Sequence, residues 1–410
     1  MSINKESAVI TSICNNKDIS TVLADNIDEI FTSHKDVWDG LKSYYLKFKA
    51  VPDISVLTER FKDFEPEKVK GETAYYVDQL KNDFLASRLR NLLLQSGTSL
   101  KTEASARIID QMQIELTKLG KFTTNVRDID LTDYESAEKH FEAVKNRSDI
   151  MGGSPGIKTG FKAIDYAYPT GMAPGHLIVM IGWPGKGKTW FSSYLACKAW
   201  EQGFKPMIIS LEMTPENMRD RIYTMLGSGL FKSSDFARGS IDMKEFDDWG
   251  KKKFLDKNGF ILVSNEGSGN VTPLTVQAKI DQHKPDIVIL DYHQLFTDTN
   301  NSKAPTERNM NISREFKMLA MRNNIPIIDI TAATAEETSD HDSPPMLNQV
   351  AWSKAIEYDA DMAIAIHKDP DNNMMEIISR KNRHGTEFGM FLDWDLNRGI
   401  VKEAYDIPMT

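Results

Sequence analysis

Residues 181–190, "IGWPGKGKTW", combine glycines and lysines directly behind the apolar run "LIVM". Gly182, Gly187, Lys188 and Thr189 fit the spacing G-x-x-x-x-G-K-[ST] of a phosphate-binding loop between a strand and a helix. In such a loop the backbone N–H groups and the helix N-terminus favour anions, the lysine meets the β and γ phosphates, and the hydroxyl ligates Mg²⁺. A glycine-rich turn that matches by chance is the weaker alternative, because strand, loop and helix follow in the required order. The predicted nucleotide-binding residues are Gly182, Trp183, Pro184, Gly185, Lys186, Gly187, Lys188, Thr189 and Trp190.

Two carboxylates follow other apolar runs. In "PDIVILDYHQL", four apolar residues lead to Asp291, which can hold Mg²⁺ opposite Thr189. In "MIISLEMTPENM", Glu212 closes a strand and can activate the water that attacks the γ phosphate. The alternative for Asp291 is a cap at the end of a buried strand, and the alternative for Glu212 is a surface carboxylate. We predict Thr189 and Asp291 as metal ligands and Glu212 as a catalytic residue.

The elements that must position these residues form a repeating pattern after residue 155. Continuous apolar runs alternate with helical segments, which predicts an α/β domain with a mainly parallel sheet flanked by helices. Chemistry in such a sheet belongs at the carboxyl ends of the strands, where the loop, Glu212 and Asp291 fall. The predicted strands are "LIVMIG", "KPMIISLE", "FILVS", "DIVILD", "IPIIDIT", "MAIAIHK", "MEIISRK" and "FGMFLDWD".

The preceding part of the chain is helical in pattern. Residues 1–120 carry apolar residues at spacings of three and four, without a strand signal or a catalytic cluster, so we predict an all-α assembly or docking domain. In the linker, 121–155, a capping box of Thr132 and Glu135 begins a short amphipathic helix. That helix can pack on its own domain or offer its stripe to a neighbouring subunit, and both alternatives stay open. Residues 156–410 form the third predicted region. The stripe consists of Tyr134, Ala137, Phe141 and Val144.

The bulk composition is that of a soluble globular protein. The chain has 410 residues, 40% apolar and 27% charged, with a net charge of −9, so any basic surface for nucleic acid must be local. No apolar stretch predicts a membrane span, and the N-terminus does not resemble a secretion signal, so we expect a cytoplasmic protein. Cys14 and Cys197 lie far apart, which argues against a disulfide framework and a zinc site.

Taken together, these motifs resemble DnaB-type replicative DNA helicases, especially the shorter bacteriophage ones, over residues 156–400. The resemblance implies a RecA-like ATPase that forms a homo-hexameric ring around single-stranded DNA. Such a ring uses ATP or another NTP with Mg²⁺, translocates 5′ to 3′ and unwinds duplex DNA. The resemblance further implies primase and a helicase loader as partners, no membrane, and the cytoplasm of a bacterial cell, for a bacterial or a bacteriophage gene. It is carried by "GIKTGFKAIDYAYPTGMAPGHLIVMIGWPGKGKTWF", "SLEMTPENMRDRI", "VILDYHQL", "ISREFKMLAMRNNIPII", "AIEYDADMAI" and "ISRKNRHG".

The same resemblance assigns the catalytic base to Glu212. It also puts Lys381 and Arg383 of "SRKNRHG" in the place of the cations donated across the subunit interface. Two cations one residue apart on a strand project from the same face, where they can neutralise charge on a γ phosphate. Without the family context, a solvated basic strand edge explains both residues better.

Two segments depart from the family pattern. Where relatives carry a glutamine that senses the γ phosphate, this chain reads "DITAATAEETSD", with alanine or Thr334 at that place. The DNA loop that carries an Arg-Glu pair in many relatives reads "NQVAWSKAIE", so Lys354 for phosphate and Trp352 for base stacking are the candidates. In the other loop, "DTNNSKAPTERN", Lys303 and Arg308 are possible phosphate contacts, though a surface loop explains them nearly as well.

Three functions therefore compete. The leading hypothesis is a replicative, NTP-driven DNA helicase. A RecA-like recombinase or clock-type DNA-dependent ATPase shares the phosphate loop but lacks the long helical domain and docking helix. A non-translocating, nucleotide-binding assembly platform is the third. Unwinding of a forked duplex separates the first two, and DNA-stimulated hydrolysis would refute the third.

Overall fold

The computed structural model describes most of the chain in two compact units, Met1–Thr132 and Asp133–Thr410. Each unit is described by itself. The residues described are 4–19, 22–23, 27–120, 131–150, 152–264, 270–300, 302–334, 342–350, 353–368 and 374–406.

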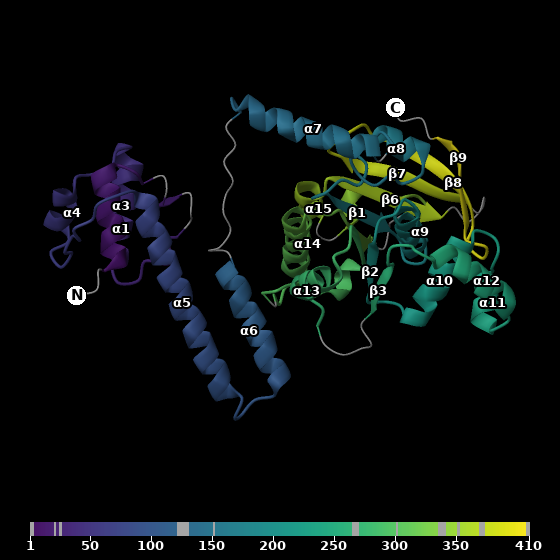
Figure 1. The fold of residues 1–410 in the computed structure, drawn as a ribbon, viewed down its shortest axis with the longest axis horizontal. Coiled ribbons are helices and arrows are strands. Elements are labelled where there is room, and N and C mark those ends of the chain that lie inside the picture. The colour runs from purple at the N-terminus through teal and green to yellow at the C-terminus, as the bar shows by residue number, and fades with distance from the viewer. Residues whose placement is uncertain are drawn as a thin grey trace. The chain divides into compact units, whose positions relative to one another are not determined.

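The first unit is built from helices around a small apolar core. Trp38 is fully buried in this core and stacks on Phe31, with ring centroids 4.8 Å apart. The long hairpin of the last two helices leaves large apolar side chains such as Leu93 and Leu94 more than 60% exposed, so this surface remains available to other proteins. The helices are α1 Lys5–Asn16, α3 Lys35–Phe48, α4 Ile54–Arg60, α5 Thr73–Ser99 and α6 Ser105–Gly120 (Figure 1).

The second unit begins with two helices, α7 Tyr134–Ile150 and α8 Lys162–Ala167. The predicted amphipathic linker helix exists as α7, and none of its residues is buried. Phe141 on its apolar stripe is 68% exposed, so the stripe does not pack against its own unit.

A nine-stranded sheet forms the centre of the second unit, in the order β3-β2-β4-β5-β1-β6-β7-β8-β9. The strands from β3 to β6 in this order are parallel, and β7, β8 and β9 continue the sheet antiparallel. The predicted mainly parallel α/β fold is thus confirmed. The strands are β1 Leu177–Gly182, β2 Pro206–Ser210, β3 Ile261–Ser264, β4 Ile287–Asp291, β5 Ile327–Ala332, β6 Met362–Lys368, β7 Met374–Asn382, β8 Gly389–Asp395 and β9 Ile400–Asp406.

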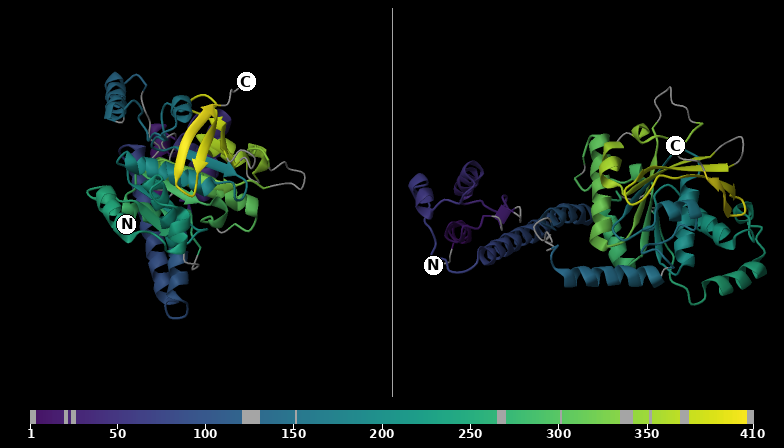
Figure 2. Two further views of the ribbon diagram at one scale, coloured as in Figure 1. Left: turned by 90° about the vertical axis from the view of Figure 1, so that its right-hand side faces the viewer. Right: turned by 90° about the horizontal axis from the view of Figure 1, so that it is seen from above.

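Helices cover both faces of this sheet, as Figure 2 shows. Alternate residues of β1 serve the two faces: Val179 and Ile181 belong to one apolar core, Ile178 and Met180 to the other. Burial on both faces explains why these strands read as continuous apolar runs. The helices are α9 Lys188–Glu201, α10 Pro215–Gly227, α11 Ser233–Arg238, α12 Met243–Phe254, α13 Pro273–His283, α14 Pro305–Asn323 and α15 Ser353–Asp359, with 3₁₀ turns η1 His293–Leu295 and η2 Leu347–Gln349.

One strand was not predicted. β9, "IVKEAYD", follows two apolar residues with two charged ones, lacks a regular alternation, and lies at the sheet edge. It has a definite structural role, because Glu403 accepts hydrogen bonds from the backbone N–H groups of Lys162 and Ala163 at the start of α8. Among the described residues, no helix is long and apolar enough to cross a membrane.

Candidate nucleotide site

The phosphate-binding loop connects β1 to α9, and its backbone requires glycine at two positions. Gly187 has a φ of 97°, and a Cβ there would lie 2.6 Å from the Met375 side chain and 2.8 Å from the Trp394 ring. A Cβ on Gly182 would lie 2.9 Å from the carbonyl oxygen of Ile366. The spacing of these two glycines is therefore imposed by the strands beneath the loop.

Lys188 folds back onto this loop. Its Nζ donates hydrogen bonds to the carbonyl oxygens of Gly182 and Trp183, each at 2.9 Å. Burial lowers the pKa of Lys188, while the negative charges of Asp291 and Glu212 oppose that shift. The ammonium group is thus held between the loop and two carboxylates, where a phosphate group can replace the carbonyl contacts.

Asp291 ends β4 beside the last residue of β2, Ser210. The side chain is 1% exposed, and burial raises its pKa to about 6, although the adjacent Thr189 hydroxyl favours the charged form. Neither carboxylate oxygen has a hydrogen bond of ordinary geometry to any described residue. Two unpartnered carboxylate oxygens next to a hydroxyl fit a hard divalent cation such as Mg²⁺, which prefers oxygen ligands.

Glu212 lies two residues beyond the end of β2 and is exposed to the cavity. The backbone N–H of Leu211 donates to the carbonyl oxygen of Asp291 at 2.7 Å, which ties the two strand ends together. Thr214 caps the next helix, α10, and Pro215 takes its first position. The negative charge of Glu212 acts on Asp291, and a free carboxylate there can accept a proton from water.

Lys188, Thr189 and Glu212 line one cavity of about 400 Å³, a volume suited to a small-molecule ligand, while Asp291 is buried behind this lining. Six of the predicted loop residues line it, but Gly182, Trp183 and Lys186 do not. The Trp183 indole is buried in the core and donates to the carbonyl oxygen of Ser343, whereas Lys186 reaches the carbonyl oxygen of Lys368. The lining residues are Pro184, Gly185, Gly187, Lys188, Thr189, Trp190, Glu212, Met213, Arg221, Tyr292, Ala332, Lys368, Trp394 and Leu396.

Arg221 is the most informative residue that the sequence reasoning missed. It lies on α10 with its guanidinium 4.5 Å from the centre of the Trp190 ring. Burial lowers its pKa, and the charges of Asp291 and Glu212 oppose that shift. One signal was available: Arg221 follows the buried Met218 by three residues, so both lie on the inward face of the helix.

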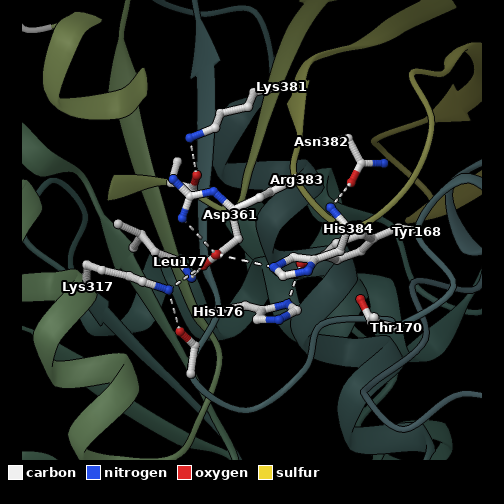
Figure 3. Close-up of polar contacts among 12 residues, drawn as sticks. Tyr168, Thr170, His176, Leu177, Lys317, Asp361, Lys381, Asn382, Arg383 and His384 are labelled. Atoms are coloured by element: carbon white, nitrogen blue, oxygen red, sulfur yellow. Dashed lines mark hydrogen bonds and ion pairs between the residues drawn. The ribbon is translucent and has the colours of Figure 1, made fainter. Parts of the chain in front are cut away.

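Lys381 and Arg383 lie at the end of the parallel strands opposite this cavity, where the end of β7 pairs with the start of β6. Figure 3 shows their surroundings. The backbone N–H of Arg383 donates to the carbonyl oxygen of Asp361, and the Asp361 carboxylate accepts from the N–H of Leu177 at the start of β1. The phosphate loop follows the other end of β1, roughly 17 Å away for five residues of strand. The two cations are therefore remote from the phosphate loop of their own chain.

The candidate DNA-contact residues are distributed over two segments. Lys303 is exposed before α14, and Arg308 is half-buried in its first turns. Lys354 is exposed near the start of α15. Trp352 lies outside the described residues.

An alanine or Thr334 is expected where relatives carry the glutamine; of these residues, Ala332 lines the cavity and Thr334 does not. A different glutamine approaches this strand end. Gln294 of η1 donates from Nε2 to the Thr331 hydroxyl at 3.2 Å and to the carbonyl oxygen of Ala332 at 3.1 Å. Its carboxamide is therefore bound to β5.

Known proteins resemble this chain in sequence. The family model "DnaB-like helicase C terminal domain" matches residues 156–398. A "Probable plasmid replicative DNA helicase" of Chlamydia psittaci is 24% identical over 95% of this chain and 90% of its own length. The replicative DNA helicase DnaB of Geobacillus stearothermophilus is 26% identical over 72% of this chain and 67% of its own.

Two solved structures share the fold. A DnaB-like replicative helicase, described with its interactions with primase, superposes with a TM-score of 0.65 at 18% identity, covering 97% of this chain and 98% of the other. The ATPase domain of G40P gives a TM-score of 0.57 at 20% identity over 68% of this chain and all of the other. Because the family model spans more than half of its residues, the chain belongs to the DnaB-like helicase C-terminal domain family.

Proposed function

We propose that this protein is a replicative DNA helicase in which a ring of six copies hydrolyses ATP, or another NTP, to move 5′ to 3′ along single-stranded DNA and unwind duplex DNA. One observation carries the proposal. The phosphate loop and Glu212 line one cavity, with the buried Asp291 beside Thr189, whereas Lys381 and Arg383 lie at the opposite end of the parallel strands.

Within one subunit, different residues bind the phosphates, activate the water and hold the metal ion. Lys188 exchanges its carbonyl contacts for the β and γ phosphates, and the first N–H groups of α9 bind the same anion. Glu212 orients the attacking water and accepts its proton. Thr189 and Asp291 would hold Mg²⁺, which supplies positive charge to the phosphate oxygens. Arg221, held on Trp190, adds a fixed cation to the same cavity.

The remaining charge comes from a neighbouring subunit. Lys381 and Arg383 stand too far from their own loop, so any phosphate they neutralise belongs to another copy. The exposed apolar stripe of α7 supports docking on that copy, because no residue of this helix is buried in its own unit.

Single-stranded DNA would contact Lys303, Arg308 and Lys354 through its phosphates, and Trp352 would stack on a base. The structural relative described with primase supports primase as a partner. A helicase loader is the other partner that we propose.

Mixed rings test this division of labour. Lys188→Ala and Arg383→Ala should each abolish most hydrolysis and unwinding of a forked duplex. In rings mixed from both variants, some interfaces pair an intact loop with an intact arginine, so DNA-stimulated hydrolysis should reappear. If subunits exchange and mixed rings stay inactive at every ratio, Arg383 does not act across the interface. A wild-type enzyme whose hydrolysis ignores DNA would instead favour a non-translocating assembly platform.

A further inference from the structure

The seven-residue helix α15 connects a predicted DNA-contact residue to the two remote cations. Lys354 lies at its beginning, and the backbone carbonyl groups at its end accept hydrogen bonds from Lys381 and Arg383. A helix of this length is a stiff rod of about 10 Å. Displacement of its first turn is therefore passed on to the carbonyl groups of its last turn.

Lys381 and Arg383 are held mostly by hydrogen bonds to backbone carbonyl groups at the end of this helix. Lys381 Nζ donates to the carbonyl oxygens of Glu357 and Ala360. Arg383 Nη2 donates to the carbonyl oxygen of Tyr358 at 2.8 Å, and its Nη1 lies 3.5 Å from the Asp361 carboxylate. Cations at a helix C-terminus are favoured by the helix dipole and by the unpaired carbonyl groups.

Asp361 fixes the place where the helix ends. Its carboxylate accepts from Lys317 Nζ at 2.6 Å and from the N–H of Leu177 at 2.8 Å, and it is 3% exposed (Figure 3). The helix packs on the core through buried Ala355 and Ile356, and the Ser313 hydroxyl donates a hydrogen bond of 3.0 Å to Asp359. Its other face, with Lys354 and Tyr358, is exposed, so a ligand can reach the helix there while Asp361 stays bound to the strands.

We propose that α15 couples DNA binding to hydrolysis: without DNA it retains Lys381 and Arg383 on its own carbonyl groups, and DNA bound at Lys354 shifts the helix and releases them toward the neighbouring subunit. This inference rests on the proposed trans role of the two cations. It also supplies a route from DNA to the catalytic charges in a chain that has alanine or Thr334 where relatives are expected to have the sensing glutamine.

Substitution at Tyr358 tests the coupling, because its side chain is 72% exposed while its backbone belongs to the last turn of the helix. Tyr358→Ala and Tyr358→Gly both remove the ring, but only glycine loosens the helix. The readout is the ratio of hydrolysis rates with saturating single-stranded DNA and without DNA. Tyr358→Ala should keep a ratio near the wild-type value. Tyr358→Gly should raise the DNA-free rate and lower the ratio at least threefold relative to Tyr358→Ala.

Ser313→Ala provides a second variant in case the glycine variant does not fold. It removes the hydrogen bond that holds Asp359 on α14, so it should lower the ratio in the same direction. Equal ratios in the alanine and glycine variants of Tyr358, with an unchanged ratio in Ser313→Ala, would overturn the coupling role. If mixed rings of Lys188→Ala and Arg383→Ala still recover activity in that case, only this inference fails. Wild-type hydrolysis that ignores DNA would overturn both the inference and the proposed function.

Discussion

Replacing Asp291 by asparagine should stabilise the nucleotide-free protein while destroying its activity. Burial raises the pKa of this carboxyl group from 3.8 to about 6. The folded state therefore holds the proton more tightly than the unfolded state, and the stability gained from this is complete below about pH 4 and lost as the pH rises through about 6. At about 1.4 kcal/mol for each pKa unit, ionised Asp291 costs the folded state up to about 3 kcal/mol at pH 8.

Asp291→Asn removes this cost because its amide carries no charge. The variant should gain about 2 kcal/mol relative to the wild type between pH 4.5 and pH 8, because part of the cost is already present at pH 4.5; this corresponds to about 4 to 8 °C in Tm for a domain of this size. The cost of burying the amide does not change with pH, so the pH dependence of the difference isolates the carboxylate. Mg²⁺ with nucleotide should reverse the order at pH 8, since it binds the folded wild type preferentially.

Calorimetry in EDTA across pH 4.5 to 8 measures this difference, with Asp361→Asn as the matched control. Burial also raises the pKa of Asp361, but bonds from Lys317 and the N–H of Leu177 outweigh it, so the net pKa is lowered. Asp361 stays ionised in this range, and the control should differ from the wild type by a constant amount. If the stability difference between Asp291→Asn and the wild type is also independent of pH, Asp291 is not a buried carboxylate with a raised pKa, and its assignment as a cation ligand is refuted.

Three further outcomes are expected at the cavity. Glu212→Gln should bind nucleotide normally but turn over roughly 10² to 10⁴ times more slowly, because an amide cannot accept the proton; single-turnover kinetics with a binding titration would show it. Arg221→Ala should weaken nucleotide affinity about tenfold, since the fixed cation on Trp190 is lost, and quenching of tryptophan fluorescence measures this change. Gly187→Ala should abolish binding in equilibrium dialysis, because its Cβ would meet the Trp394 ring; wild-type affinity would contradict the loop geometry.

The sequence predicted best where chemistry follows directly from chain order. Glu212 and Asp291 each come at the end of a continuous apolar run. Parallel strands that pair in register bring their carboxyl ends together on one side of the sheet. The phosphate loop reaches the same edge because β1 belongs to the same parallel set. For these groups, strand direction alone determines proximity.

Residues that reach the site by tertiary packing carried no such signal. Trp394 lies about two hundred residues after the phosphate loop and reaches Gly187 only because β7 and β8 fold back antiparallel. Lys368 ends β6 as one basic residue among many. The prediction that Lys381 and Arg383 share one strand was wrong for Arg383, because β7 ends at Asn382 and Arg383 lies in the turn that follows. The sequence also did not place them at the end of the strands opposite the loop, because that depends on the register of β7 with β6.

Ala332 lines the cavity with a side chain that cannot form a hydrogen bond to a nucleotide. The carboxamide of Gln294 is bound to the backbone of β5, so it holds the strand end in place and does not reach the cavity lining. The contacts that leave the loop are backbone ones: Ala333 donates to the carbonyl oxygen of Gly182, which also accepts from Lys188. Thr334 then donates from its backbone to the carbonyl oxygen of Gln349, at the start of the segment that leads into α15. If Lys188 moves toward a phosphate, it leaves a carbonyl group that Ala333 shares, so we expect the change to reach Gln349 through backbone contacts without a side-chain sensor.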